Sequence, residues 1–328
     1  MLKNRQYVFW LLFCCIITGR ASSAEDSAGV ASSASLLKSE KDKSDTELNQ
    51  KYDPGTSSLE LQGRLAIVTG GASGIGRSVA MVLARENVTV IVADINQTGG
   101  EETIEYLKML SKDLPHKAIH VDVRNSTSVA FLIQCIEMEY SNMTISILVN
   151  SAGILHKITP VVNLTDETFN DVISTNLKGT FLVTKATVKH MLSRNVTGAA
   201  IVNIASILGK GGFPGLGAYT ASKGGVVAFT KAIAVELATR GIRVNAILPG
   251  LTNTPMIRKY ESETIKERLR KMIPMQRIAE PLEISETIVF MCSMKTSYMT
   301  GSTVDVAQTT TAEVQTPPGG QSSSFSSS

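Results

Sequence analysis

The sequence predicts an α/β protein with one doubly wound parallel sheet and helices on both faces. Short apolar runs rich in β-branched residues alternate with longer segments whose apolar residues recur at helical spacing. The runs are nearly continuous in apolar character, as expected for strands that are buried on both faces. A glycine-rich turn joins the first run to the first helical segment. These three observations together favour a Rossmann-type sheet, in which ligands bind beyond the carboxyl ends of the strands.

Six runs are predicted to form the buried strands of this sheet. In chain order they are RLAIVT at 64–69, VTVIVAD at 88–94, AIHVDV at 118–123, ISILVNSAG at 145–153, AAIVNIAS at 199–206 and IRVNAILPG at 242–250. Helical segments separate them, so the connections are expected to be right-handed crossovers.

Composition excludes several classes of protein. The chain has 328 residues, 43% of them hydrophobic, which is ample for a core, and its net charge of +3 is not concentrated in a long basic run. We therefore expect no nucleic-acid partner. Two of the four cysteines, Cys14 and Cys15, lie in the N-terminal segment, and the four histidines lack metal-ligand spacing. Neither a disulfide framework nor a protein-bound metal site is expected.

Four segments are expected along the chain. Residues 1–24 have basic residues, an apolar run and small residues near Ala24, which is the layout of a secretory signal peptide; a mitochondrial presequence is the alternative. Residues 25–62 are polar enough to form a flexible spacer, and residues 309–328 to form a disordered tail. Residues 63–308 show no repeat and no shift in composition, so we expect a single domain there.

The predicted location of the protein is the secretory pathway, in the endoplasmic reticulum or outside the cell, with the mitochondrial matrix as the alternative. Six Asn-X-Ser/Thr sequons, which favour the secretory route, lie at Asn87, Asn96, Asn125, Asn142, Asn163 and Asn195.

The turn after the first strand has the features of a phosphate site. Its predicted cofactor contacts are Gly70, Ser73, Gly74, Ile75 and Gly76, because glycines let the backbone approach a pyrophosphate and the following helix presents free amides. Asp94 ends the second strand, where a carboxylate accepts both ribose hydroxyls and repels a 2′-phosphate. The sequence therefore predicts NAD, with NADP disfavoured. An ordinary strand-end cap is the alternative role for Asp94.

Tyr219 and Lys223 are four residues apart in a segment with helical spacing, so both side chains lie on one face. An ammonium group beside a phenol stabilises the phenolate, and we expect the pKa of Tyr219 to be lowered for acid/base work. Ser206 ends a predicted strand thirteen residues earlier, where ligands are expected.

These motifs resemble the short-chain dehydrogenase/reductase family. TGGASGIG at 69–76, NSAG at 150–153, NLKGTF around Asn176, YTASK at 219–223 and PGLTNTPM at 249–256 have its order and spacing. The resemblance implies hydride transfer with a nicotinamide cofactor and four catalytic residues. Tyr219 would exchange the proton, Lys223 would hold the nicotinamide ribose, Ser206 would bind the carbonyl oxygen, and Asn176 would organise a water relay. Further implied cofactor contacts are Asp122, Val123, Asn150, Ala152, Gly153, Pro249, Gly250, Thr252 and Thr254.

Within the family the chain is most similar to the 3-oxoacyl-(acyl-carrier-protein) reductase branch and to related 17-beta-hydroxysteroid dehydrogenases, through motifs such as IASILGKGG and KMIPMQR. The resemblance implies a 3-oxoacyl thioester, a (3R)-3-hydroxyacyl group or a steroid as substrate, an acyl carrier protein as a possible partner, and a homo- or hetero-tetramer. A dehydrogenase for a small polar alcohol or sugar, and a non-catalytic NAD-binding scaffold, are the alternatives.

Two segments bear on substrate and assembly. Residues 251–280 mix apolar and basic residues and are expected to choose the substrate, although a solvated helix face would have the same composition. The chain also has AQTTT at 307–311, where the family usually continues with a Gly-Gly pair.

Overall fold

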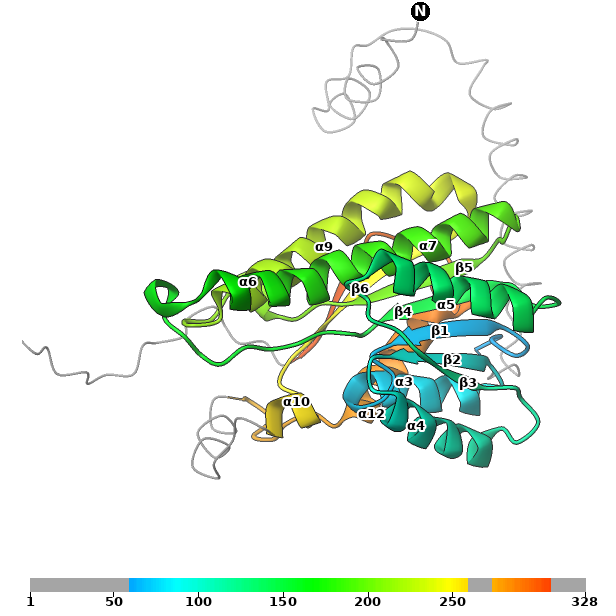
Figure 1. Cartoon of the computed structure of the whole chain (residues 1–328), viewed down its shortest axis with the longest axis horizontal. Coiled ribbons are helices and arrows are strands. Elements are labelled where there is room, and N and C mark those ends of the chain that lie inside the picture. The colour runs from blue at the N-terminus through cyan, green and yellow to red at the C-terminus, as the bar shows by residue number, and fades with distance from the viewer. Residues whose placement is uncertain (1–58, 259–272, 308–328) are drawn as a thin grey trace, which may run out of the picture. The chain divides into compact units, whose positions relative to one another are not determined.

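The computed structural model describes residues 59–258 and 273–307. Seven strands form one parallel sheet in the order β3-β2-β1-β4-β5-β6-β7 (Figure 1). They are β1 Leu65–Thr69, β2 Thr89–Asp94, β3 Lys117–His120, β4 Ile145–Asn150, β5 Ala199–Ile204, β6 Ile242–Pro249 and β7 Thr303–Val306. The order changes direction between β1 and β4, which creates a crevice beyond their carboxyl ends.

The α/β class and the doubly wound parallel sheet predicted from the sequence are confirmed. All six predicted strands are present, but several end earlier than predicted. β4 stops at Asn150, not 153, and β5 stops at Ile204, not 206, because the residues that follow turn away from the sheet toward the crevice. β7 completes the sheet beside β6, with Val306 opposite Pro249.

Helices cover both faces of the sheet (Figure 1). One layer contains α3, α4 and α12, and the other contains α5, α7 and α9 with α6 beside them. The helical segments are α3 Gly74–Arg85, α4 Gln97–Leu110, α5 Ser126–Glu139, α6 Asp166–Ile173, a π-helical stretch Ser174–Lys178, α7 Gly179–Ser193, α8 Leu208–Gly211, α9 Gly217–Leu237, α10 Pro255–Arg258 and α12 Pro281–Cys292, with short 3-10 turns at Val161–Asn163, Ala238–Arg240 and Met294–Thr296.

The strands are apolar throughout because each one packs against both helix layers. In β1, Ala66 and Val68 belong to the core cluster that includes the α3, α4 and α12 side chains. Leu65 and Ile67 belong to the cluster that includes the α5, α7 and α9 side chains. This alternation follows from the two-residue period of a strand.

The packed domain begins before residue 63, where the sequence predicted its start. Leu61 is 1% exposed and lies in the core, and Leu59 packs against the same cluster. The expected signal peptide, most of the expected spacer and the expected tail from 309 lie outside the described residues. In residues 59–258 and 273–307 no helix has the length and apolar character needed to cross a membrane, and no group of three metal-ligating side chains gathers.

Candidate active site

The backbone around the turn between β1 and α3 leaves no room for a side chain at Gly70 or Gly76. Gly70 has φ of 68°, and a Cβ there would lie 2.7 Å from the backbone nitrogen of Ala152. A Cβ on Gly76 would overlap the carbonyl oxygen of Gly70. Ser73 precedes α3 but makes no side-chain capping bond. The backbone therefore approaches the crevice closely, and the first amides of α3 are not capped by the Ser73 hydroxyl.

Asp94 is fixed at the end of β2 by two backbone amides. Its Oδ2 accepts a hydrogen bond from the Ala72 N–H at 2.9 Å, and its Oδ1 accepts one from the Asn96 N–H, also at 2.9 Å. The carboxylate therefore does serve as a strand-end cap. It also lines the cavity described next, so the capping role and a ribose-binding role are compatible.

A cavity of about 1670 Å³ lies at the carboxyl ends of the strands and contains most of the predicted site residues. Those that line it are Gly70, Ser73, Gly74, Ile75, Asp94, Asp122, Val123, Ala152, Gly153, Ser206, Tyr219, Lys223, Pro249, Gly250, Thr252 and Thr254. Three predicted site residues lie outside its wall: Gly76, Asn150 and Asn176.

Asn150 faces the interior of the domain, not the cavity. Its Nδ2 donates to Thr184 Oγ1 at 3.0 Å and to Asn203 Oδ1 at 2.8 Å. The side chain, 3% exposed, therefore links β4 to β5 and α7. The prediction that it borders the cofactor has no support from this placement, because the side chain points between the strands and the helix layer.

Asn176 lies in the π-helical stretch between α6 and α7 and is fully buried. Its Oδ1 accepts from the Ile154 N–H at 2.8 Å, and its Nδ2 donates to the Ile154 carbonyl at 3.0 Å and to Ser222 Oγ at 3.0 Å. The amide therefore joins the segment after β4 to the helix that carries Tyr219 and Lys223.

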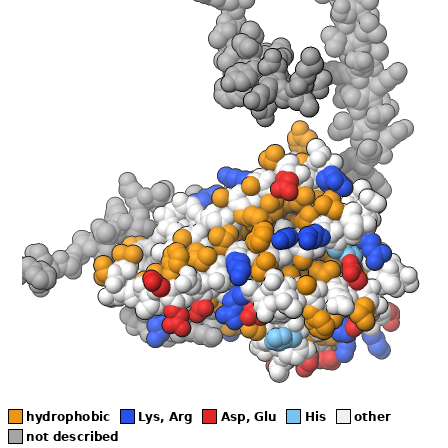
Figure 2. All heavy atoms as spheres, turned by 45° about the horizontal axis from the view of Figure 1, so that its top comes forward, with side chains coloured by type: hydrophobic (Ala, Val, Ile, Leu, Met, Phe, Trp, Pro, Cys, Tyr) orange, Lys and Arg blue, Asp and Glu red, His pale blue; other side chains and the backbone are white. Residues whose placement is uncertain are grey.

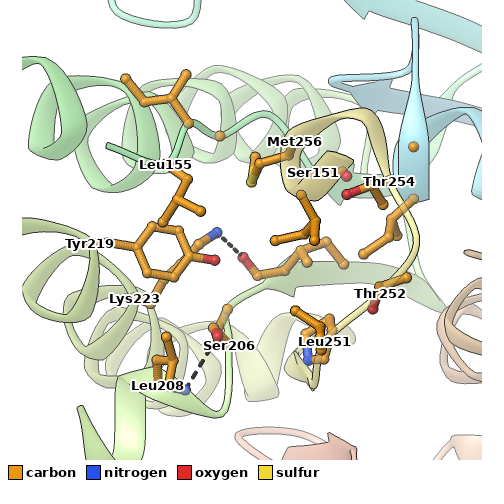
Figure 3. A pocket seen from close by; sticks show the side chains of 18 of the residues that line it. Ser151, Leu155, Ser206, Leu208, Tyr219, Lys223, Leu251, Thr252, Thr254 and Met256 are labelled. Atoms are coloured by element: carbon orange, nitrogen blue, oxygen red, sulfur yellow. Dashed lines mark hydrogen bonds between the residues drawn. The ribbon is translucent and has the colours of Figure 1, made fainter. Parts of the chain in front are cut away.

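Ser206, Tyr219 and Lys223 come together on one side of the cavity, with Thr252, Thr254 and Met256 across from them (Figure 3). Lys223 Nζ lies 5.8 Å from the centre of the Tyr219 ring and donates to the Ile204 carbonyl at 2.7 Å. The Ser206 hydroxyl accepts from the Leu208 N–H at 3.2 Å and lies close enough to the Tyr219 phenol to influence its pKa. One turn of α9 thus places a phenol and an amine beside the end of β5.

The protonation of these groups is set mainly by burial. Burial raises the pKa of the Tyr219 phenol, and the nearby Ser206 hydroxyl offsets this only in part. The expectation that the pKa of Tyr219 lies below its usual value is therefore wrong for this structure. Burial lowers the pKa of Lys223 to about 8, because the low-dielectric interior disfavours the ammonium form.

The two ends of the cavity differ in character. At the β3 end, the Asp122 carboxylate accepts hydrogen bonds from Nε and Nη2 of Arg124, which hold the pKa of the carboxyl below the ordinary value. At the β6 end, Thr252 donates to the Gly250 carbonyl at 3.0 Å, and Thr254 lies against the glycine turn near Gly74.

Known proteins share this fold and these motifs. A family model described as enoyl-(acyl carrier protein) reductase matches residues 70–308. Human (3R)-3-hydroxyacyl-CoA dehydrogenase is 36% identical over 251 residues, which cover 75% of this chain and 95% of that protein. The 3-oxoacyl-(acyl-carrier-protein) reductase of Thermotoga maritima is 36% identical over 250 residues, covering 76% and 98%.

The chain belongs to the short-chain dehydrogenase/reductase family. A solved member, the 3-ketoacyl-(acyl-carrier-protein) reductase from Brucella melitensis complexed with NADH, superposes with a TM-score of 0.68 at 31% identity and covers 75% of this chain and 98% of that one. The family assignment makes this chain an oxidoreductase that acts on CH–OH groups with a nicotinamide cofactor.

The residues present fit such a dinucleotide. The glycine turn and the start of α3 would hold the pyrophosphate, and Asp94 would hold a ribose. At Gly153 a Cβ would lie 3.1 Å from Asn176 Oδ1 and 3.6 Å from Lys223 Nζ, so the backbone there is also close to the reactive groups.

The cavity wall formed by the segments after β4 and β5 was not predicted. Ile154, Leu155, His156, Leu208 and Leu216 all line the cavity. Their positions just beyond two strand ends were the available signal, because ligands in this kind of sheet lie there. Ser222 was also missed, and nothing in its local sequence indicates its bond with Asn176.

The segment expected to choose the substrate is described in part. Met256, Ile257, Ile273 and Met275 line the cavity, while residues 259–272, including most of the basic side chains, lie outside the described residues. Arg258 donates to Asn253 Oδ1 at 2.9 Å, and Arg277 pairs with Glu283 at 2.6 Å.

Proposed function

We propose that this enzyme interconverts a 3-oxoacyl thioester and the corresponding (3R)-3-hydroxyacyl thioester with NAD(H). The observation that carries the proposal is the group of Ser206, Tyr219 and Lys223 beside a largely apolar wall. Such a wall suits an acyl chain or a 17-beta-hydroxysteroid better than a small polar alcohol or sugar. The names of the similar human and Thermotoga maritima enzymes support the thioester.

The chain's own residues supply binding and proton transfer. A bound nicotinamide, held by the glycine turn, Asp94 and Lys223, would supply the hydride chemistry at the carbon that bears the hydroxyl or ketone oxygen. In the reducing direction the Ser206 hydroxyl donates to the carbonyl oxygen where negative charge develops, and the Tyr219 hydroxyl delivers the proton to that oxygen. The buried Lys223 ammonium stabilises the Tyr219 phenolate that remains. This attraction offsets part of the desolvation cost of the phenolate charge.

Substitution of Tyr219→Phe tests this mechanism. It removes only the hydroxyl, so we expect kcat for acetoacetyl thioesters to fall about 10²- to 10⁴-fold while NADH binding, measured by fluorescence, is retained. Equal turnover with and without the hydroxyl would contradict the assigned role. Acetoacetyl thioesters, estradiol and simple sugars assayed side by side test the substrate class.

We further propose NAD as the cofactor, with NADP disfavoured. The position of Asp94, held by two backbone amides at the ribose end, supports this, because a fixed carboxylate repels a 2′-phosphate. Asp94→Ala is expected to reduce the ratio of kcat/KM with NADH to that with NADPH. An unchanged ratio would mean that residues other than Asp94 select between NADH and NADPH.

A tetramer, of identical or mixed subunits, is proposed for the assembly. Figure 2 shows hydrophobic side chains gathered on the face that α5, α6, α7 and α9 form. Exposed members are Phe131 (56%), Phe169 (41%), Phe181 (40%) and Val235 (80%). Patches of this kind favour association between subunits. Light scattering of the purified full chain tests the proposal, and a monomer at micromolar concentration would contradict it.

An acyl carrier protein is proposed as a carrier of the substrate. The exposed Arg240, at the 3-10 turn after α9, is a basic position suited to an acidic carrier. Arg240→Glu is expected to raise KM for the carrier-bound substrate and not for the coenzyme A thioester.

For localisation we propose the secretory pathway, with the mitochondrial matrix as the alternative. All six sequon asparagines are exposed, whereas the four asparagines that are buried in residues 59–258 and 273–307, namely Asn150, Asn176, Asn203 and Asn245, lie outside sequons. This distribution supports glycosylation in the secretory lumen. Expression of the full chain, followed by glycosidase treatment and N-terminal sequencing, tests it. A cleaved chain that co-fractionates with mitochondria and does not shift with glycosidase would favour the alternative.

A further inference from the structure

Arg77 lies in the first turn of α3, directly after the glycine turn. Its neighbour Thr103 lies in α4, the next helix of the same layer (Figure 1). Both residues are outside the cavity wall, whereas Ser73, Gly74 and Ile75 line the cavity. The mechanism and the cofactor fit use neither side chain.

The guanidinium of Arg77 joins the glycine turn to α4. Its Nη2 donates to the Ala72 carbonyl at 2.5 Å and lies 3.1 Å from the Gly99 carbonyl oxygen, and its Nε donates to Thr103 Oγ1 at 2.9 Å. The Thr103 hydroxyl is fully buried and has two acceptors within reach, the carbonyl oxygens of Gly71 at 3.0 Å and Gly99 at 2.9 Å. Two consecutive carbonyls of the turn therefore lie against polar groups of α3 and α4.

Ala72 is held through both of its backbone groups. Its carbonyl accepts from Arg77, and its N–H donates to Asp94 Oδ2 at 2.9 Å. A Cβ at Gly99 would lie 3.1 Å from the Cβ of Ala72, so α4 also packs closely against this residue. A peptide segment bound at both groups cannot rotate about φ or ψ without breaking a hydrogen bond. The direction of the Ala72 N–H, and with it one oxygen of the Asp94 carboxylate, therefore depends on Arg77.

We propose that Arg77 is a positioning residue for cofactor selection. By fixing Ala72 it holds the Asp94 carboxylate in the direction that accepts the ribose hydroxyls and excludes a 2′-phosphate. The inference rests on the proposed use of NAD. In this role Arg77 acts through Ala72 and Asp94 and needs no contact with the cofactor.

A direct effect of the Arg77 charge would have the opposite sign. A cation near the ribose attracts a 2′-phosphate, so its removal would increase the preference for NAD. Loss of a positioning group would instead decrease that preference. In addition, Glu102 Oε2 lies 3.0 Å from Arg77 Nη2 and offsets part of the positive charge. The direction of the change therefore separates the two roles.

Fluorescence titration of the full chain with NADH and with NADPH tests the proposal without turnover. Arg77→Met removes the donors and keeps an extended side chain. We expect the Kd for NADH to rise about tenfold. The Kd for NADPH should rise by less, because a looser carboxylate also repels the 2′-phosphate less strongly. Arg85→Met is the matched control, since it removes an arginine of the same helix from its ion pair with Glu286 and should leave both Kd values unchanged.

A double variant shows whether Arg77 acts through Asp94. In the Asp94→Ala background, Arg77→Met should no longer change the ratio of the NADPH Kd to the NADH Kd, because the carboxylate that it positions is gone. The same change in this ratio with and without Asp94 would overturn the proposal.

Two conservative variants keep the test independent of the stability of Arg77→Met. Thr103→Val keeps the shape of the buried side chain and removes its hydroxyl, so it should lower the ratio of the NADPH Kd to the NADH Kd in the same direction but by less. Arg77→Lys keeps the charge and lacks the fixed geometry of the guanidinium, so it should recover only part of the wild-type ratio.

The remaining outcomes distinguish this inference from the proposed cofactor. An equal rise in both Kd values would overturn the inference and make Arg77 a structural residue of the turn. A rise in the ratio of the NADPH Kd to the NADH Kd would overturn it in favour of a direct charge effect. A wild-type protein that binds NADPH as tightly as NADH would instead refute the proposed cofactor. A wild-type preference for NADH that Arg77→Met leaves unchanged would refute the role of Arg77 alone.

Discussion

The side-chain amide of Asn176 holds both backbone groups of Ile154, with Oδ1 accepting from its N–H at 2.8 Å and Nδ2 donating to its carbonyl at 3.0 Å. The π-helical stretch between α6 and α7 places Asn176 where it reaches a segment 22 residues earlier. A third bond, to Ser222, continues this connection to α9, which carries Tyr219. One buried amide thus aligns the cavity wall with the catalytic helix.

Asn176→Ala is therefore expected to affect both stability and catalysis. Loss of the three bonds should lower the free energy of unfolding by about 1–3 kcal/mol, measured by urea denaturation, and should reduce kcat/KM about tenfold by loosening the segment after β4. Asn170→Ala, at an exposed position of α6, is the matched control and should change stability by less than about 0.5 kcal/mol. Wild-type kinetics in Asn176→Ala would show that the amide does not position the site.

The glycine turn gives a second prediction. A Cβ at Gly76 would overlap the Gly70 carbonyl oxygen, so Gly76→Ala must displace the turn that approaches the dinucleotide. We expect the Kd for NADH to rise by at least about tenfold and the melting temperature to fall. At Gly217, the first residue of α9, a Cβ would meet nothing within 4 Å. Gly217→Ala should therefore bind NADH normally, and equal NADH binding by both variants would refute the argument.

The parts of this protein that the sequence predicted depend on local pattern. The six strands follow from short apolar runs, and the positions of Tyr219 and Lys223 on one side of α9 follow from their four-residue spacing. The doubly wound sheet and a ligand site beyond the carboxyl ends of its strands follow from the alternation of strands and helices and from right-handed crossovers, whereas the strand order and β7 were not predicted.

The features that the sequence did not predict depend on contacts between segments that are distant along the chain. The bond between Asn176 and Ile154, the inward direction of Asn150 and the burial of Leu61 each need neighbours that no local window contains. The raised pKa of Tyr219 has the same origin. A Tyr–Lys spacing predicts proximity, but burial depends on how α9 packs against β5 and the cavity wall.

The buried Lys223 should give the enzyme a distinctive dependence of stability on pH. Burial lowers its pKa to about 8 from 10.5, so between these values the unfolded chain holds a proton that the folded chain has lost. Stability therefore rises with pH across this window, and below pH 8 the folded state bears the full cost of the buried charge, about 3 kcal/mol. Lys223→Met removes this contribution, although it also leaves the Ile204 carbonyl without its donor.

We expect the slope of the free energy of unfolding against pH to differ between Lys223→Met and the wild type. Urea unfolding from pH 7.5 to 10.5 should show the stability of Lys223→Met falling relative to that of the wild type as pH rises. Lys231→Met, at an exposed position of the same helix, should follow the wild-type curve. Parallel curves for Lys223→Met and the wild type would mean that the amine keeps an ordinary pKa in the folded state.

His116 gives a dependence of the same sign in a more acidic range. Its Nδ1 accepts from the Val90 N–H at 3.0 Å, its Nε2 lies 2.7 Å from Ser111 Oγ, and burial lowers the pKa of the ring to about 4 from 6.5. Between these values the unfolded chain takes up a proton that the folded ring does not, so stability is lost as pH falls from about 6.5 to 4. The imidazole must stay neutral because a protonated Nδ1 cannot accept the hydrogen bond from the Val90 N–H that joins the ring to β2.

His116→Gln keeps polar atoms near Val90 but cannot gain a proton in this range. Its stability should be lower than that of the wild type at pH 7 and should fall less between pH 7 and pH 5, as measured by urea denaturation. If both proteins lose the same stability over that interval, the acid sensitivity must come from other groups, and the neutral ring at β2 is not its cause.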